Sequence, residues 1–250
     1  DMRRFLILLA AVIMPLAAAA QAQITTKKIK ISDFPQKTTK VVLTGNALFD
    51  AVLKEEIAAR WRIAPYEFCT LQEFNDLKEK DNYYFLISTK GQFKKEAEPG
   101  LTFLSLVKGG GDASKGLDQM LEVVSFPFAS VEDPSGREYV FLPSFIDIIQ
   151  KYTLDSMEND FDGYTGLPNY TMNISRSGNM TLVFSEADLA ADVNPSVRNA
   201  CFDEDVLVLE EEDAEEYLSP ENSNTLVSYV AVPSDGKPGA FCYKMLIDPQ

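Results

Sequence analysis

Short apolar runs and helix-like stretches alternate along the first half of the chain. The runs typical of buried strands are 40–44, 66–69, 83–88 and 101–107, and the stretches with helical spacing between the first three are 46–61 and 70–80. Asn46 can cap the first of these helices, and Thr70 with Glu73 has the spacing of a capping box. Because strands that alternate with helices form parallel sheets covered by those helices, this half predicts an α/β fold.

The second half of the chain carries less regular patterns. We predict a long amphipathic helix over 138–157, a shorter helix over 117–124, and strands at 180–184 and 206–209. The last two apolar runs, 225–232 and 240–247, flank a connection rich in Pro and Gly, which predicts an antiparallel hairpin. No internal repeat is visible in the sequence.

Together these elements predict one α/β domain of three layers. The expected core is a mixed, mostly parallel sheet with helices on both faces and a C-terminal antiparallel hairpin at its edge. We expect residues 23–37 to form an exposed N-terminal arm and residues 38–250 to form the domain. The segment 158–179 loses its apolar periodicity and is the candidate sub-boundary.

The start of the chain has the layout of a secretory signal peptide. Arg3 and Arg4 precede an apolar core at 5–16, and alanines lead to a small-x-small site that ends at Ala22. The apolar core is shorter than the roughly 20 residues that a membrane-spanning helix needs. The sequence therefore predicts cleavage after residue 22, export to a periplasmic or extracellular location, and no membrane span in the mature protein.

Charge and composition narrow the range of functions. The formal net charge is −15, and the chain contains no histidine. An acidic protein repels phosphate backbones and anionic lipid head groups, and no basic cluster is present, so we do not expect nucleic-acid binding. The lack of histidine excludes Ser-His-Asp and Cys-His nucleophile pairs and the usual histidine zinc sites. Catalysis would have to depend on carboxylates, Lys, Tyr, or Ser with Lys.

A candidate metal site follows the long predicted helix. Glu158, Asp160 and Asp162 precede Gly163 with the alternate spacing of oxygen ligands at the start of a calcium loop. Asn169 stands where such a loop has its bidentate glutamate, and the first ligand is Glu rather than Asp. Ca²⁺ is therefore a candidate ligand, and a solvated acidic loop is the alternative interpretation.

The same irregular segment gathers aromatic and polar groups outside the predicted core. Tyr164 and Tyr170 can stack on a sugar or a peptide, and Asp160, Asp162 and Asn169 can supply hydrogen bonds. These five residues form the candidate ligand-binding site. Ordinary packing of the loop is the alternative.

Three further patterns suggest chemistry. Carboxylates crowd the acidic patch 203–216, which can attract cations or a basic partner or simply keep the surface soluble. The glycine-rich segment 108–116 can cradle a phosphate, although Asp112 opposes an anion and a mobile connection is the alternative. Ser105 and Lys108 have S-x-x-K spacing, but alternation along a strand puts their side chains on opposite faces.

The three cysteines permit one disulfide and one unpaired thiol in an oxidising compartment. Because Cys69 lies in an apolar strand pattern, Cys201 and Cys242 are the predicted pair. Three reduced, buried cysteines are the alternative.

Two segments resemble a secreted α/β family of Bacteroidetes-type bacteria. They are the run KVVLTGNALFDAVLKEEIAARWRIAPYEFC (40–69), followed by NYYFLI (82–87), and the closing SYVAVPSD…FCYKMLID (228–248). The resemblance implies export to a periplasm and an α/β sheet, and it assigns no activity. It also draws attention to Asp155, Ser156 and Met157, which are similar to the O-glycosylation motif of that bacterial group.

These observations predict an exported, non-catalytic binding or interaction protein of the bacterial envelope, whose partner is an envelope protein or a glycan. One alternative is a carboxylate-dependent hydrolase acting on glycans, with Asp160 and Asp162 as the nominated pair. The other is an envelope assembly component that recruits a basic partner through the acidic patch.

Overall fold

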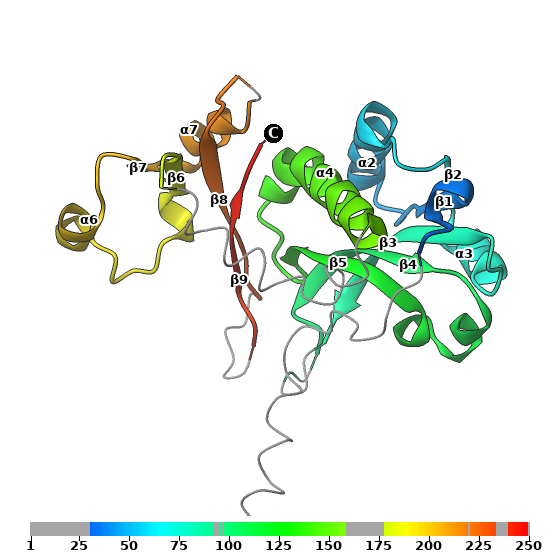
Figure 1. Cartoon of the computed structure of the whole chain (residues 1–250). Helices are drawn as coiled ribbons and strands as arrows, with labels where there is room; N and C mark the ends of the chain where they lie inside the picture. The colour runs from blue at the N-terminus through cyan, green and yellow to red at the C-terminus, as the bar shows by residue number, and fades with distance from the viewer. Residues whose placement is uncertain are drawn as a thin grey trace, which may run out of the picture.

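A computed structural model of the chain describes residues 31–92, 96, 98–158, 178–219, 221–233 and 240–249. These residues form two β-sheets, with a long helix packed against both (Figure 1). The predicted signal peptide lies outside the described residues, and so does the segment 159–177 between the two sheets.

The first sheet has five strands in the order β2-β1-β3-β4-β5. Their bounds are β1 (Thr38–Val42), β2 (Tyr66–Cys69), β3 (Tyr83–Gly91), β4 (Leu101–Lys108) and β5 (Leu121–Ser130). β1 is parallel to β2 and β3, whereas the pairs β3–β4 and β4–β5 are antiparallel. The helices α2 (Ala47–Arg60) and α3 (Leu71–Leu77) connect the parallel strands and cover opposite faces of the sheet.

Both predicted helix starts in this half are confirmed. The Asn46 side chain accepts hydrogen bonds of 3.1 Å from the backbone N–H groups of Leu48 and Phe49, which α2 itself leaves unpaired. At the start of α3, Thr70 and Glu73 satisfy each other's backbone N–H groups in a capping box. Local sequence therefore fixes where each helix begins.

The second sheet has four strands in the order β7-β6-β8-β9. Their bounds are β6 (Thr181–Ser185), β7 (Val206–Leu209), β8 (Thr225–Ala231) and β9 (Tyr243–Ile247), with α6 (Pro195–Cys201) and α7 (Glu211–Glu215) as connections. β6 is parallel to β7 and β8, and β8 and β9 form the predicted antiparallel hairpin.

The two sheets repeat one topology, although the sequence shows no repeat. In each sheet, the first strand along the chain (β1 or β6) pairs in parallel with the next two strands (β2 and β3, or β7 and β8). The second of those two strands (β3 or β8) then pairs in antiparallel fashion with the strand that follows it (β4 or β9). Thus β1-α2-β2-α3-β3-β4 corresponds in order and direction to β6-α6-β7-α7-β8-β9. The first sheet has one strand more, because β5 pairs with the outer side of β4.

The helix α4 (Arg137–Glu158) joins the two halves through one shared core. Phe145 packs against Phe126 and Phe128 of β5, with ring centroids 4.7 and 6.1 Å away, and against Tyr229 of β8 at 5.0 Å. The Tyr229 hydroxyl donates a hydrogen bond to the Phe128 carbonyl oxygen, which ties β8 to β5 directly. Apolar side chains of both sheets are therefore buried in the same hydrophobic core.

Two parts of the predicted fold differ from the structure. The C-terminal hairpin does not extend the first sheet but completes a second one. The predicted helix at 117–124 is a short 3-10 turn, Leu117–Gln119, followed by β5. A short apolar run is compatible with either element, and pairing with β4 decided the outcome, since Leu121 lies opposite Lys108 in the antiparallel register.

The described part of the predicted N-terminal arm, residues 31–37, is only partly exposed. Ile31 and Phe34 are fully buried, and the Phe34 ring meets Tyr84 and Trp61 edge-on at 4.7 and 6.4 Å. Asp33 accepts hydrogen bonds from the Tyr84 hydroxyl and from the amino group of Lys108. Ile31 and Phe34 therefore anchor this segment in the core of the first sheet, whereas Ser32, Pro35 and Gln36 stay exposed.

Candidate functional site

The predicted ligand-binding residues lie outside the part of the chain that the structure describes. These are Asp160, Asp162, Tyr164, Asn169 and Tyr170, and the calcium prediction depends on two of them. Glu158 is the last residue of α4. Within the described ranges, no three Cys, Asp or Glu side chains gather as a metal site. The glycan and calcium hypotheses therefore stay predictions.

Two modification predictions do fall on described residues. Ser156 is 3% exposed, in the last turns of α4, so folding removes it from the reach of a glycosylating enzyme. All three cysteines are unpaired thiols in the structure: Cys69 is buried, and Cys201 and Cys242 are exposed. Cys201 ends α6, which precedes edge strand β7, and Cys242 precedes β9 at the opposite edge of the sheet.

The glycine-rich segment after β4 packs against the protein's own backbone instead of forming an anion site. A Cβ atom at Gly109 would lie 2.3 Å from the Lys80 carbonyl oxygen, so only glycine fits there. The N–H groups of Gly109 and Gly110 donate to the carbonyl oxygens of Tyr83 and Lys78. These two backbone donors are therefore used within the protein itself.

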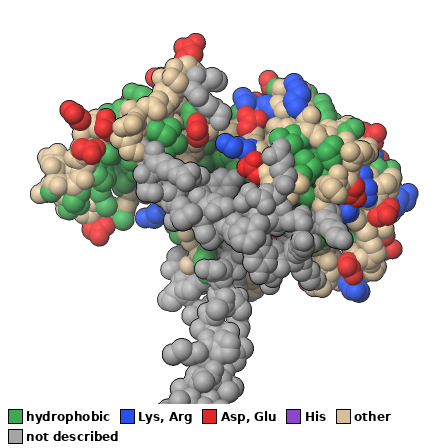
Figure 2. Space-filling view, viewed as in Figure 1, with side chains coloured by type: hydrophobic (Ala, Val, Ile, Leu, Met, Phe, Trp, Pro, Cys, Tyr) green, Lys and Arg blue, Asp and Glu red, His purple; other side chains and the backbone are tan. Residues whose placement is uncertain are grey.

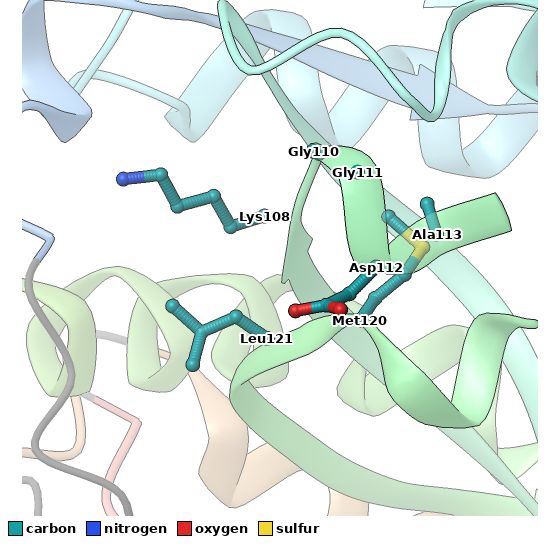
Figure 3. A pocket seen from close by; sticks show the side chains of 8 residues that line it. Lys108, Gly110, Gly111, Asp112, Ala113, Met120 and Leu121 are labelled. Atoms are coloured by element: carbon teal, nitrogen blue, oxygen red, sulfur yellow. The ribbon is translucent and has the colours of Figure 1, made fainter. Parts of the chain in front are cut away.

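A small hollow remains beside this segment (Figure 3). Its volume is about 90 Å³, well below the roughly 300 Å³ of small ligand pockets. The Lys108 side chain extends away from the glycines, and its amino group pairs with Asp33 at 2.8 Å. This ion pair and the Tyr84 hydroxyl hold the pKa of Asp33 well below its ordinary value, although burial opposes the shift. Neither the hollow nor this ion pair presents reactive groups to a substrate.

The S-x-x-K pattern does not form a nucleophile pair. Ser105 is buried in the middle of β4 and hydrogen-bonds across the sheet to the hydroxyls of Thr89 at 3.0 Å and Ser125 at 2.7 Å. Lys108 reaches Asp33 instead. The two side chains therefore make separate structural contacts, as strand alternation predicts.

The described carboxylates with raised pKa values sit in packed surroundings. Burial raises the pKa of Glu122 on β5, and a hydrogen bond from Ser125 offsets part of that shift. Burial also raises the pKa of Glu215, although Arg137 beside it acts in the opposite direction. Glu215 is engaged by Arg137 through an ion pair of 3.0 Å, so it is held in a structural contact.

The raised pKa of Glu122 leads to a prediction about stability and pH. A carboxyl group whose pKa is raised in the folded state stabilises that state most below its ordinary pKa of 4.5, and this contribution is lost as the pH rises through the raised value. Glu122→Gln should remove this loss, so the variant should gain stability over the wild type between pH 4.5 and pH 8. Urea unfolding across this pH range measures the difference. For the exposed control Glu55→Gln, the stability difference from the wild type should not change with pH. The same pH dependence in both variants would contradict the raised pKa of Glu122 as its cause.

The acidic patch is divided in two by the second sheet. Asp203, Glu204 and Asp205 are exposed before β7, and the remaining carboxylates follow it from Glu210 onward. Four extended residues separate these groups by roughly 13 Å, so they form two clusters at opposite ends of one edge strand. The patch is thus not a continuous acidic surface.

Two residues of the second cluster hold Arg137, the first residue of α4. The Arg137 guanidinium pairs with Asp188 at 2.8 Å, Glu215 at 3.0 Å and Glu211 at 3.5 Å. It also stacks over the rings of Phe141 and Tyr229. No local sequence pattern indicated this network, because its members come from α4, α7 and the turn after β6.

The side of the second sheet opposite to α4 forms what we call the outer face. Strand alternation and register assign it the apolar side chains of Leu182, Phe184, Val206, Val208, Leu226, Val230 and Leu246, together with the polar Ser228 and Lys244. The apolar side chains are half-buried, Ser228 is buried and Lys244 is exposed. The Phe202 ring stacks on Phe184 with centroids 6.0 Å apart, while α6 buries none of its own residues.

Charge around the outer face is mostly negative, although Lys244 lies on the face itself. Among the described residues from 178 onward, Arg198 and Lys244 are the basic ones, and Arg198 pairs with Glu186. Figure 2 shows red and green side chains prevailing over blue on the part of the molecule that carries β6, β7 and α6. An apolar surface with acidic surroundings is complementary to an apolar segment with basic flanks.

In the comparisons with known proteins, no family model, no curated protein and no solved structure matches this chain. Across the residues that the structure describes, none of the helices has the length and apolar character to cross a bilayer. The chain is thus characterised by its architecture, an α/β fold of two mixed sheets with one repeated topology.

Proposed function

We propose that this protein is an exported, non-catalytic interaction protein that binds a basic polypeptide through the outer face of its second sheet. The observation that carries the proposal is the outer face itself, an array of half-buried aliphatic and aromatic side chains with acidic clusters at both ends of its edge strand. Apolar area supplies binding energy, and the surrounding carboxylates favour a basic partner and speed its association. Export is supported by the signal-peptide layout of residues 1–22.

Site-specific photo-cross-linking in envelope extract of the native host tests this proposal. A photoreactive residue at Val206, on the outer face, should form a cross-link to a partner segment rich in Lys and Arg, identified by mass spectrometry. The same residue at Leu48, which is 63% exposed on α2, should give no such product. Equal cross-linking at both positions, or a partner segment without basic residues, would refute the proposal.

Neutralising the first acidic cluster gives a second, independent readout. Asp203→Asn, Glu204→Gln and Asp205→Asn together should lower the yield at Val206 and weaken its dependence on salt, because they remove exposed attractive charges. The matched control is Glu55→Gln, Asp76→Asn and Glu79→Gln, three exposed carboxylates of the first half, and it should leave the yield unchanged.

A further inference from the structure

The repeated topology allows the two sheets to be compared position by position. Cys69 and Leu209 end β2 and β7, and the next helix begins two residues later in each case. Their partners in the central strands are Val42 and Ser185. Val42 and Ser185 therefore occupy the same position in the two sheets. Starting from this pair, the strand registers assign the corresponding residues in every other strand.

This correspondence shows that the outer face has a counterpart in the first sheet. The corresponding pairs, first sheet then second, are Val41 and Phe184, Tyr84 and Leu226, and Leu106 and Leu246. In the first sheet all three positions are 0% exposed. In the second sheet these three positions are also apolar but only half-buried, whereas the positions of Leu86 and Leu104 hold Ser228 and Lys244.

The cover over the two faces explains the difference in burial. In the first sheet, the face is closed by α2, which buries Phe49, Leu53 and Ile57, and by α4 packed beside α2. In the second sheet, the helix at the position of α2 is α6, which has 7 residues against 14 and buries none of them. α4 lies on the opposite face of that sheet, where Tyr229 points, so among the described helices it adds no cover to the outer face.

We propose that the outer face docks an amphipathic helix of the partner protein, in the place that the helical layer of α2 and α4 holds over the first sheet. This inference rests on the proposed function and adds to it the secondary structure of the partner segment. The helix presents an apolar stripe to Phe184, Leu226 and Leu246, with Lys and Arg on its flanks beside the acidic clusters of β7.

The dimensions of the sheet fit a short helix. A helix that runs along the strands, as α2 does between the parallel strands β1 and β2, can follow β8, whose 7 residues extend roughly 23 Å, about the length of 15 residues of α-helix. The alternative of an added strand beside β7 is less well suited, because β7 has only 4 residues. A strand at that edge would also not touch Leu226 on β8 or Leu246 on β9, so it would leave the apolar positions of those strands uncovered.

Two designed peptides of equal composition distinguish these modes of binding. Both contain Leu and Lys in about 14 residues, one with the leucines at helical spacing and the other with strict alternation, which favours a strand. Titration calorimetry at physiological ionic strength should show at least about tenfold tighter binding of the helical peptide. A helical peptide of Leu and Glu is the charge control and should not bind.

Variants of the protein locate the binding site. Leu226→Glu places a charge on the outer face, and Val206→Glu places one on its edge strand in case the first variant folds poorly. Either change should weaken binding of the helical peptide by at least about tenfold. Leu48→Glu, on an exposed position of α2, should leave binding unchanged.

Hydrogen exchange on the wild-type complex supplies a readout that needs no variant. A docked helix should leave exchange of the outer-edge backbone N–H groups of β7 unchanged, whereas an added strand should slow it. Equal binding of the two designed peptides, tighter binding of the alternating one, or new protection along β7 would overturn the helix proposal while the proposed function stands. If neither Lys peptide binds and Val206 yields no basic partner, the proposed function itself fails.

Discussion

Replacing Arg137 by alanine should lower the free energy of unfolding by about 3–5 kcal/mol, because it leaves buried carboxylates without their counter-charge. The side chains of Arg137 and Asp188 are each only 6% exposed, so water cannot take the place of the guanidinium. Urea denaturation at neutral pH measures the loss, provided that wild type and variant have the same dependence of the unfolding free energy on urea concentration.

A matched control separates burial from charge. Arg198 also pairs with a glutamate, Glu186, but that carboxylate is largely exposed, so Arg198→Ala should cost no more than about 1 kcal/mol. Equal losses in the two variants would contradict a special role for the Arg137 network.

The network should also respond to pH in a defined direction. Burial raises the pKa of Glu215, and Arg137 opposes that shift, so removing Arg137 should raise the pKa further. A raised carboxyl pKa contributes stability that is present at low pH and lost as the pH rises. The loss of unfolding free energy caused by Arg137→Ala should therefore be larger at pH 7 than near pH 4.5, the ordinary pKa of Glu215. A deficit that grows on acidification would contradict this account.

Replacing Phe145 by alanine should cost about 3–5 kcal/mol, because it opens a cavity where both sheets meet α4. Its ring is fully buried among Phe126, Phe141 and Tyr229, and these side chains cannot all move in to fill the space. Val140→Ala, on a position of α4 that is 46% exposed, should change stability by less than about 0.5 kcal/mol.

The same variant tests whether the two halves unfold as one unit. Trp61, the single tryptophan, lies in the first half and reports on that half by fluorescence, whereas far-ultraviolet circular dichroism reports on both. We expect the two signals to give the same midpoint, shifted together by Phe145→Ala, since one core spans both sheets. Separate midpoints would show that the halves fold independently.

Much of the first sheet, its helices and the long helix α4 could be predicted from local sequence. The strand at β1, the caps at Asn46 and Thr70, and the helix α4 follow from residue types within a few positions of each other. The C-terminal hairpin was predicted for the same reason, since its two strands are adjacent in the chain. The strand β5 was mistaken for a helix because only its pairing with β4 distinguishes the two.

The repeat of topology could not be seen because corresponding positions share burial pattern and direction rather than residue identity. Tyr84 and Leu226 stand at the same place in the two sheets, and so do Val41 and Phe184. Interior packing accepts many apolar residues of different shape, so such a correspondence appears only once the strands are paired. The outer face was missed for this reason, since its members come from four strands.

By itself, the sequence determined the local elements, the acidic balance, the lack of histidine chemistry and the layout of an export signal, because each depends on residue types or on neighbours in the chain. Only the tertiary structure decided that there are two sheets, that Arg137 of α4 pairs with Glu215 of α7, and that, among the described residues, one sheet face has less helical cover than its counterpart. These features bring together residues far apart in the chain, and long-range pairing and shared burial select them, which no local pattern records.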